Sequence, residues 1–249
     1  MRKRVSKVYA IILHSKFYIL HSAHFPSVRT CAIIPAYNEA TRIGAVIRGA
    51  RQYVDEVIVV IDGSTDDSAA VARTEGARVI VHPENCGAGA ATMTGLEAAR
   101  TLGYEIAITV DADGQHATAD IPKLIAALSA GADLAIANRF GGKKTSIPFI
   151  RRIFNGIGNA VTFFATGIWL PDTQCGFKAF GPRALRQVDL RMSGFEFCTE
   201  IIREAARFRW NVTSVPSRVV YSEYTLAKGQ SFASGIHTAA KILLRSFLR

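Results

Sequence analysis

Hydrophobic and polar residues alternate in blocks along the first part of the chain, and the blocks predict strands and helices in turn. Short aliphatic and β-branched runs predict strands at residues 31–34, 56–61, 78–82, 105–110 and 133–137. Apolar residues at helical spacing predict helices at 41–53, around 68–74, from the segment 85–91 through 102, and at about 121–129. Near-continuous apolar strands alternating with helices are typical of a mostly parallel sheet with helices on both faces. We therefore predict an α/β fold.

The second half of the chain has a less regular pattern. It predicts helices at 150–168 and 195–208, a short strand at 176–180 and an extended segment at 212–221. The last segment has apolar residues on one helical face and Lys241, Arg245 and Arg249 elsewhere, which predicts an amphipathic basic helix. With no internal repeat or linker, we predict one domain at 30–230, a basic N-terminal extension at 1–29 and the C-terminal helix at 231–249.

The formal net charge of +10 lies entirely at the two ends of the chain. Residues 1–30 carry six Lys or Arg and residues 225–249 carry four, with no acid in either segment, whereas residues 31–224 are balanced. A nucleic-acid-binding protein would spread its basic charge over the folded domain, so no nucleic acid partner is expected. Basic ends favour an anionic membrane surface. Packing of the last helix on its own domain, or on a second copy in a homodimer, is an equal alternative.

Composition limits both the class of protein and the cellular compartment that we expect. The chain has 249 residues, of which 49% are hydrophobic and 20% charged, as in ordinary globular domains. Its longest apolar run, at 160–170, is shorter than the roughly 18 residues of a membrane span, so an integral membrane protein is not expected. The four cysteines form no C-x-x-C pair, which favours free thiols over a structural zinc site or a disulfide framework. The N-terminal apolar run is too short for a secretory signal, and we expect a cytoplasmic protein peripheral to the membrane.

Polar clusters follow three of the predicted strands, at residues 35–39, 62–67 and 111–116. Ligands of open α/β sheets bind outside the carboxyl ends of the strands, and these clusters occupy that place. Asp, Gly, Ser and Asn are also ordinary turn residues, which would explain any one cluster alone. Three such clusters together favour a binding site.

Asp111 and Asp113 carry the strongest chemical signal. Two carboxylates at positions i and i+2 that leave a strand point to the same side and can share one hard divalent cation, Mg²⁺ or Mn²⁺. Gln115 and His116 follow closely enough to complete or orient the ligand shell. A solvated acidic turn is the alternative.

The ordered motifs C-A-I-I-P-A-Y-N-E (31–39), D-G-S-T-D (62–66), D-A-D-G-Q-H (111–116) and Q-C-G-F (174–177) resemble family 2 glycosyltransferases. Within them, residues 31–235 are most similar to dolichol-phosphate mannosyltransferases and polyprenyl-phosphate hexosyltransferases. The resemblance implies a GT-A fold, a nucleotide diphosphate sugar donor (GDP or UDP) and a polyprenyl phosphate acceptor.

The resemblance also implies roles for individual residues. The residues that would bind the nucleotide sugar are Pro35, Tyr37, Glu39, Asp62 and Asp111, and among them Asp62 would contact the nucleotide base. The residues that would bind the metal are Asp111, Asp113 and Gln115. One departure is clear, because many members have two aspartates before the glycine of the second motif and this chain has Ile61 at the first position.

The acceptor is suggested by a cationic stretch. Residues 134–171 contain no acid, but they contain Arg139, Lys143, Lys144, Arg151 and Arg152. Arginine holds phosphate oxygens bidentately. The resemblance assigns the acceptor phosphate to Arg139 and to Arg151 or Arg152, and it places Lys228 near the phosphate in a segment similar to prenyl-phosphate transferases. A solvated loop, a basic helix start and an ordinary turn are the alternatives.

A phosphate acceptor is already an anion, so catalysis would consist of positioning and of stabilising charge on the leaving diphosphate. We expect one in-line displacement of a hexose, with inversion, and Asp113 and Arg139 as catalytic residues. One alternative is a family 2 enzyme that acts on a saccharide hydroxyl, which requires a carboxylate base. The other is a non-catalytic protein that binds sugar nucleotides or anionic lipids.

Overall fold

The computed structural model describes residues 28–141, 149–194 and 196–219, and gives the backbone alone for 149–154. The described strands are β1 (Thr30–Ala36), β2 (Glu56–Asp62), β3 (Arg78–His82), β4 (Ile106–Thr109), β5 (Leu134–Asn138), β6 (Lys178–Phe180) and β7 (Val212–Pro216). The helices are α1 (Ile43–Ala50), α2 (Ser68–Thr74), α3 (Ala88–Thr101), a 3₁₀ turn (Thr118–Asp120), α4 (Ile121–Ser129), α5 (Phe149–Thr166), α6 (Pro182–Gln187) and α7 (Phe197–Phe208).

The strands form one sheet in the order β3-β2-β1-β4-β6-β5-β7. All the pairs are parallel except those of β6, which runs antiparallel to β4 and β5. The mostly parallel sheet predicted from the sequence is therefore confirmed. Strand β6 lies between β4 and β5, which both precede it in the sequence.

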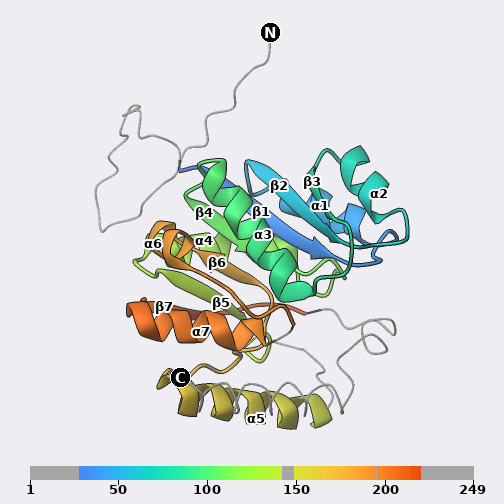
Figure 1. Cartoon of the computed structure of the whole chain (residues 1–249). Coiled ribbons are helices and arrows are strands. Elements are labelled where there is room, and N and C mark those ends of the chain that lie inside the picture. Colours follow the sequence, from blue (N-terminus) through green and yellow to red (C-terminus); the bar gives the residue numbers. More distant parts are fainter. Residues whose placement is uncertain (1–27, 142–148, 195, 220–249) are drawn as a thin grey trace, which may run out of the picture.

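Helices cover both faces of the sheet. The chain runs outward from β1 to β3 and then returns to β4 on the other side of β1, so right-handed crossovers place α1 and α2 on one face and α3 on the opposite face. Helix α3 packs on β1 and β2 and also contacts α6 and α7, whereas α4 packs on β5, β6 and β7. Figure 1 shows α3 crossing in front of the sheet and α5 lying below α7.

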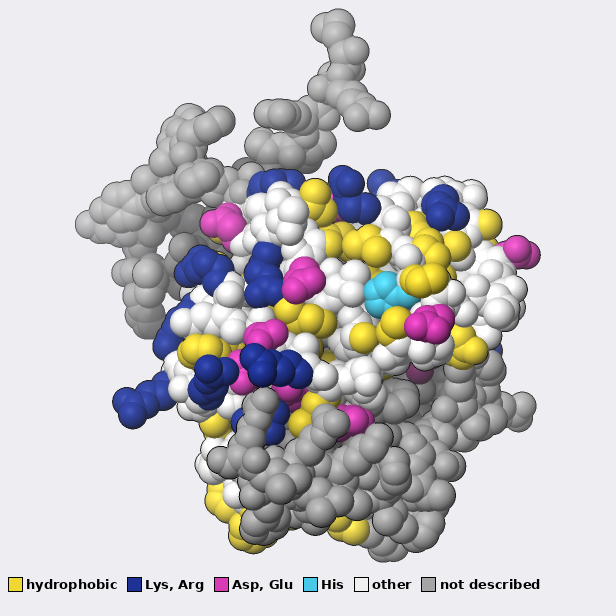
Figure 2. All heavy atoms as spheres, in the orientation of Figure 1, with side chains coloured by type: hydrophobic (Ala, Val, Ile, Leu, Met, Phe, Trp, Pro, Cys, Tyr) yellow, Lys and Arg dark blue, Asp and Glu magenta, His cyan; other side chains and the backbone are white. Residues whose placement is uncertain are grey.

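The core forms where the sequence pattern is most continuous. Residues Cys31–Ile34 of β1 and Val57–Ile61 of β2 are buried on both sides of the sheet, as expected for strands covered by two helical layers. Helix α1 contributes the apolar face predicted from its spacing. Over the surface drawn in Figure 2, Lys and Arg side chains are interspersed with Asp and Glu, in keeping with the balanced charge of residues 31–224.

The differences from the predicted elements are small. Strands predicted from apolar runs occur within one or two residues of their expected bounds, and α6, which has only six residues, was not predicted. The predicted C-terminal helix 231–249 lies outside the described residues, as does the N-terminal extension up to residue 27. None of the helices in the described ranges is both long and apolar enough to cross a bilayer.

Candidate active site

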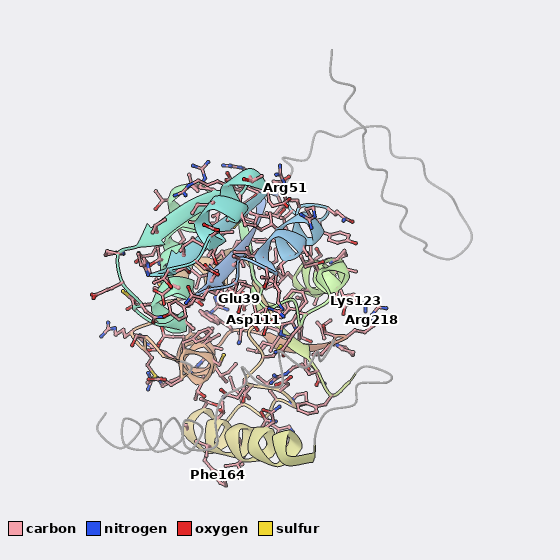
Figure 3. All side chains as sticks on the ribbon, turned by 90° about the vertical axis from the view of Figure 1, so that its right-hand side faces the viewer. Glu39, Arg51, Asp111, Lys123, Phe164 and Arg218 are labelled. Carbon is pink, nitrogen blue, oxygen red and sulfur yellow. The ribbon has the colours of Figure 1, made fainter. Side chains whose placement is uncertain are left out.

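The three polar clusters lie at one edge of the sheet. Strands β2, β1 and β4 are neighbours and parallel, so the loops that follow their carboxyl ends stand side by side. Figure 3 shows Glu39, from the loop after β1, close to Asp111, from the loop after β4, in the middle of the molecule. The sheet thus brings together clusters that are separated by about 70 residues of sequence.

The loops after β1 and β2 are joined by hydrogen bonds. The Asn38 backbone N–H donates to Ser64 Oγ at 3.0 Å, and the Thr65 N–H donates to Asn38 Oδ1 at 2.9 Å. Asp66 accepts the Ala40 N–H at 3.0 Å and a hydrogen bond from the Ser68 hydroxyl. The D-G-S-T-D motif therefore joins these two loops, which is the turn role that the sequence had left open.

The carboxylate of Asp66 is strongly bound by the donors of these two loops. Burial by itself would raise the pKa of its carboxyl, but the Ser68 hydroxyl and the surrounding N–H donors outweigh burial and lower the pKa. The Glu39 backbone N–H also donates to Ser68 Oγ, at 2.8 Å, which fixes the backbone that carries the Glu39 carboxylate. Glu39 is buried, and Tyr37 two residues before it is exposed.

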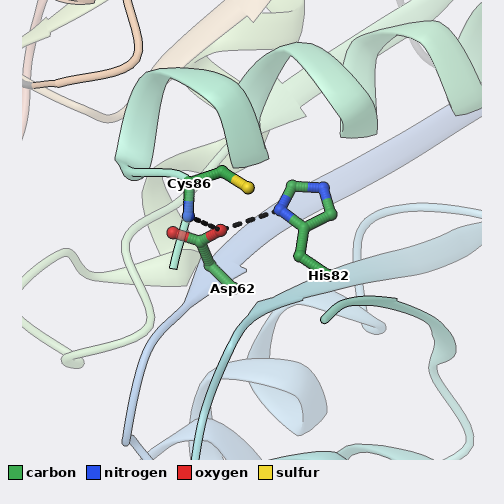
Figure 4. A group of neighbouring side chains, drawn as sticks. All are labelled: Asp62, His82 and Cys86. Atoms are coloured by element: carbon green, nitrogen blue, oxygen red, sulfur yellow. Dashed lines mark hydrogen bonds and ion pairs between the residues drawn. The ribbon is translucent and has the colours of Figure 1, made fainter. Parts of the chain in front are cut away.

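Asp62 ends β2 and is almost fully buried. Its Oδ1 accepts the Cys86 N–H at 2.9 Å and lies 2.7 Å from His82 Nδ1, and its Oδ2 accepts the Gly87 N–H at 2.8 Å (Figure 4). Both oxygens of the residue predicted to contact the nucleotide base are therefore engaged with the loop between β3 and α3. The contact of Asp62 with a nucleotide stays a prediction.

Glycines allow this loop to approach closely. Gly87 has φ of 97°, a left-handed value that L side chains rarely adopt, and a Cβ there would collide with the Ser193 carbonyl. The Gly89 N–H donates to the same carbonyl at 2.7 Å. The glycines at 87 and 89 thus serve close packing at the start of α3.

Asp111 lies just beyond β4, beside His116. Its Oδ2 is 3.3 Å from His116 Nε2, and its carboxylate packs directly on Gly176, where a Cβ would collide with it. Burial opposes ionisation of Asp111, but the His116 hydrogen bond and the charges of Lys178 and Arg139 outweigh burial and lower the pKa. Asp111 is thus held as a carboxylate, with His116 in the orienting role that the sequence suggested.

Asp113 shares the electrostatic environment of Asp111. Its Oδ1 accepts the Gln115 backbone N–H at 2.9 Å. Burial and the negative charge of Asp111 raise the pKa of Asp113, and Glu39 acts in the same direction. Asp111 and Asp113 repel each other beyond the end of β4, and a hard divalent cation relieves such repulsion, so these two carboxylates fit Mg²⁺ or Mn²⁺. Metal binding by the Gln115 side chain stays a prediction.

A buried lysine lies behind the acidic site and was missed from the sequence. Lys178 in β6 is fully buried, with its Nζ donating to the Cys175 carbonyl and lying 3.3 Å from Cys198 Sγ. Its positive charge lowers the pKa of Asp111. A lysine directly after the Q-C-G-F motif, in a run that is otherwise apolar, was the available signal.

Arg139, at the end of β5, is bound by a second residue that was missed. Its Nε and Nη2 each donate to one oxygen of Asp172 at 2.7 Å, and its backbone N–H donates to Oδ2 at 3.0 Å. The positive charge of Arg139 also lowers the pKa of Asp111, so the two groups interact electrostatically. The guanidinium thus has a fixed orientation, and its contact with an acceptor phosphate stays a prediction.

The structure says less about the other residues that were predicted to belong to the site. Pro35 is half-buried in β1, next to the loop that carries Tyr37 and Glu39. Arg151 and Arg152 belong to α5, but their side chains lie outside the described part of the structure, as do Lys143, Lys144 and Lys228 altogether.

Helix α5 is tied to the loop before β6. Asn159 Oδ1 accepts the N–H and the hydroxyl of Thr173 at 3.0 and 2.8 Å, and its Nδ2 donates to the Pro171 carbonyl at 2.7 Å. On the outer side, Phe164 is 85% exposed and Trp169, just after the helix, is 64% exposed. Figure 3 shows Phe164 pointing away from the domain. The hydrogen bonds of Asn159 thus connect α5 to the segment that contains Asp172 and Gly176. We call the exposed side chains Phe164 and Trp169 the aromatic surface.

Comparison with known proteins identifies the family. The profile of the family described as Glycosyl transferase family 2 matches residues 31–189. The chain is 32% identical over 235 residues to the UDP-N-acetylglucosamine–dolichyl-phosphate N-acetylglucosaminyltransferase of Methanococcus voltae, covering 85% of this chain and 94% of that protein. It is 30% identical over 227 residues to the polyprenol monophosphomannose synthase of Mycolicibacterium smegmatis, covering 86% and 85%.

The fold also matches a solved structure. Glucosyl-3-phosphoglycerate synthase from Mycobacterium tuberculosis, in complex with Mn²⁺, UDP-glucose and phosphoglyceric acid, superimposes with a TM-score of 0.68 at 21% identity, over 88% of this chain and 80% of that one. This likeness confirms the GT-A architecture implied by the sequence motifs. The chain therefore belongs to glycosyl transferase family 2 and is a glycosyltransferase.

Proposed function

We propose that the protein transfers a hexose from a nucleotide diphosphate sugar to a polyprenyl phosphate, with inversion and with a divalent cation. The observation that carries the proposal is that Asp111, Asp113 and Glu39 act on one another electrostatically at one edge of the sheet, where the charge of Arg139 also favours the ionised form of Asp111. Two relatives support the acceptor class, since each shares about a third of its aligned residues with this chain. Their names refer to dolichyl phosphate and to polyprenol.

The cation would be held by Asp111 and Asp113. When bound, it neutralises charge on the leaving diphosphate and so assists departure of the nucleotide. The chain's own contribution is to keep both carboxylates in place: His116 and Gly176 orient Asp111, and the Gln115 N–H orients Asp113. Lys178 and Arg139 favour the ionised form of Asp111.

The donor would bind at the loops after β1 and β2, which are joined by hydrogen bonds. Tyr37, which is exposed, and Glu39 lie on the first of these loops, and Asp62 is the last residue of β2, just before the second. Ile61, which stands where many family members have aspartate, is buried in β2 and belongs to the core. The substitution therefore removes no group from the described surface of the site.

The acceptor would approach from the side of Arg139 and α5. A phosphate oxygen attacks the sugar carbon without needing a proton removed, so no carboxylate base is required. Asp172 is bound through both carboxylate oxygens to Arg139, so it is not available as a base for a sugar hydroxyl.

Access to a lipid acceptor requires proximity to the membrane. The exposed aromatic side chains Phe164 and Trp169 are suited to the lipid–water interface, where one side of a ring is apolar and the other is wet. We propose that this surface lies on the cytoplasmic face of the membrane. The predicted C-terminal basic helix would add to the attraction.

Transfer of labelled sugar tests the proposal. UDP- and GDP-hexoses are offered with a short-chain polyprenyl phosphate in detergent, with Mg²⁺, Mn²⁺ or EDTA. We expect labelled lipid that disappears with EDTA and in Asp113→Asn, while Glu97→Gln, at an exposed position of α3, retains activity. Label transferred to a saccharide acceptor and never to lipid would replace the lipid acceptor in the proposal. Absence of nucleotide binding would overturn it.

A further inference from the structure

Three donor atoms of different chemistry converge where β2 and β3 end. Asp62 is the last residue of β2, His82 is the last residue of β3, and Cys86 lies in the following loop (Figure 4). One ligand atom from each, a carboxylate oxygen, an imidazole nitrogen and a thiol sulfur, lies within 4.8 Å of the others. Oxygen, nitrogen and sulfur together form a donor set for a borderline cation such as Zn²⁺ rather than for Mg²⁺.

The backbone holds these donors in place. The N–H groups of Cys86 and Gly87 donate to the two oxygens of Asp62, at 2.9 and 2.8 Å. Gly63, with φ of 66°, lets the turn after β2 press against the backbone of Glu84, where a Cβ would collide. The two loops therefore hold the Asp62 carboxylate and the backbone of Cys86 in place without any added ligand.

His82 already has a partner for its second ring nitrogen. Its Nε2 lies 3.0 Å from Thr94 Oγ1 in α3. A metal-binding histidine commonly donates its other N–H to such a group, which sets the tautomer and the direction of the ring. With Nδ1 coordinated, Nε2–H donates to the Thr94 hydroxyl oxygen, so the ring needs no new hydrogen-bond partner.

The thiol is accessible, in contrast to the other cysteines. Cys86 is exposed, whereas Cys31, Cys175 and Cys198 are buried. On coordination the Cys86 thiol gives its proton to solvent and forms the sulfur–metal bond. The thiolate and the Asp62 carboxylate then balance the charge of a divalent cation, and a water completes four-coordination.

We propose that Asp62, His82 and Cys86 form a binding site for a thiophilic divalent cation, with Zn²⁺ as the cation that best fits them. Zinc bonds of about 2.0–2.3 Å separate neighbouring donors by about 3.3–3.8 Å. The Asp62–His82 contact, now 2.7 Å, therefore opens slightly while the sulfur turns inward. The site shares no residue with the Asp111–Asp113 pair, and β1 separates β2 from β4 in the sheet. It does use Asp62, so the cation and the nucleotide of the donor would compete for this carboxylate.

Cobalt absorption tests the proposal on the full-length protein, since Co²⁺ replaces Zn²⁺ and gives a thiolate-to-metal charge-transfer band. We expect this band to saturate at one equivalent and to be displaced by Zn²⁺. Cys86→Ser should remove the band and weaken Zn²⁺ binding by more than about tenfold, and Thr94→Val should keep the band with about tenfold weaker binding. Asp113→Asn should retain the band, which separates this site from the acidic pair.

Absence of a thiolate band in the wild-type protein, or an equal band in Cys86→Ser, would overturn the proposal. Circular dichroism shows whether each variant is folded. If Cys86→Ser were misfolded, alkylation of the wild-type protein supplies the same test, because Zn²⁺ should slow the reaction of the exposed thiol if it binds and leave it unchanged if it does not. None of these measurements uses sugar transfer, so the outcome is independent of the proposed enzyme activity.

Discussion

Arg139 and Asp172 form a bidentate ion pair that connects the end of β5 to the segment before β6. Two N–H···O contacts of 2.7 Å join the guanidinium to the carboxylate, and Asp172 also accepts the backbone N–H of Arg139. The Asp172 side chain is 1% exposed and that of Arg139 is 15% exposed. Paired geometry of this kind fixes the plane of the guanidinium, whose charge also lowers the pKa of Asp111.

Removing the carboxylate should destabilise the fold. Asp172→Ala removes the carboxylate that binds the buried Arg139 guanidinium bidentately, and the free energy of unfolding should fall by about 3–5 kcal/mol in urea titrations. Asp189→Ala is the control, because its pair with Arg191 is exposed on both sides, and it should change stability by less than about 1 kcal/mol. If the free energy of unfolding fell by a similar amount in the two variants, the buried Arg139–Asp172 pair would stabilise the fold no more than the exposed pair does.

Gly176 is expected to control the metal site through the volume of its missing side chain. In Gly176→Ala the added methyl group collides with the Asp111 carboxylate and displaces it. Manganese affinity, measured by electron paramagnetic resonance titration, should fall by about 10- to 100-fold. Wild-type affinity in a folded Gly176→Ala protein would contradict this.

Gly156→Ala provides the matched control. Gly156 lies in α5, and a Cβ there meets no atom within 4 Å. The same substitution should therefore leave manganese affinity unchanged and raise the free energy of unfolding by about 0.5–1 kcal/mol, because alanine loses less conformational freedom than glycine in a helix.

The strands and the acidic pair were predictable because their signals are local. The runs around Ile33 and Val59 are β-branched, aliphatic and buried on both faces, so their patterns reflect the structure directly. Asp111 and Asp113 follow such a run, and the parallel sheet then determines which loops they meet. The place of the site at this edge therefore followed from the order of strands.

Partners that are remote in sequence were not predictable. Asp172 lies 33 residues after Arg139, and its role depends on the loop that returns the chain to β6. Lys178 sits in a strand of only three residues, too short for any periodicity to assign it to the core. The Asp62–His82–Cys86 cluster has no recognisable spacing, because two strand ends and a loop bring its members together. These features depend on tertiary packing, which a single sequence does not contain.

Asp120 should make stability depend on pH. Its Oδ2 accepts the Ser217 hydroxyl at 3.0 Å and the Arg218 N–H at 2.8 Å, and Lys123 pairs with Oδ1. Burial opposes ionisation, but Lys123 and these donors outweigh it and lower the pKa of Asp120. A carboxyl whose pKa is lower in the folded state stabilises the fold above its unfolded value of about 3.9, and this contribution is lost as the pH falls through the folded value.

Asp120→Asn should therefore be less stable than the wild type by about 1–3 kcal/mol at neutral pH. The difference should shrink as urea titrations are repeated at pH values below about 4. Ser129→Ala, which removes an exposed hydroxyl bonded to the Ile125 carbonyl, should show no such trend. A difference that stays constant from neutral to acid pH would exclude the ionised carboxylate as its cause.

The aromatic surface beside α5 predicts a spectroscopic response to membranes. Phe163 contacts both Phe164 and Trp169 edge-on, with ring centroids 5.8 and 5.7 Å apart, so the three rings form one cluster. Trp169 is exposed and the second tryptophan, Trp210, is buried. Vesicles that contain anionic lipid should therefore shift the emission of Trp169 to the blue while Trp210 stays in its present environment.

Variants distinguish insertion of this cluster from other causes. Trp169→Phe should abolish the spectral shift, and Phe164→Asp should weaken vesicle binding by about tenfold or more, since burying a phenylalanine side chain contributes about 1.5–3 kcal/mol. Val81→Asp is the control, because Val81 is also exposed but lies on β3, at the opposite edge of the sheet from β7. If Val81→Asp weakened binding as much as Phe164→Asp, or if emission stayed constant with vesicles, the lipid acceptor would have to reach Arg139 by a route that does not use α5.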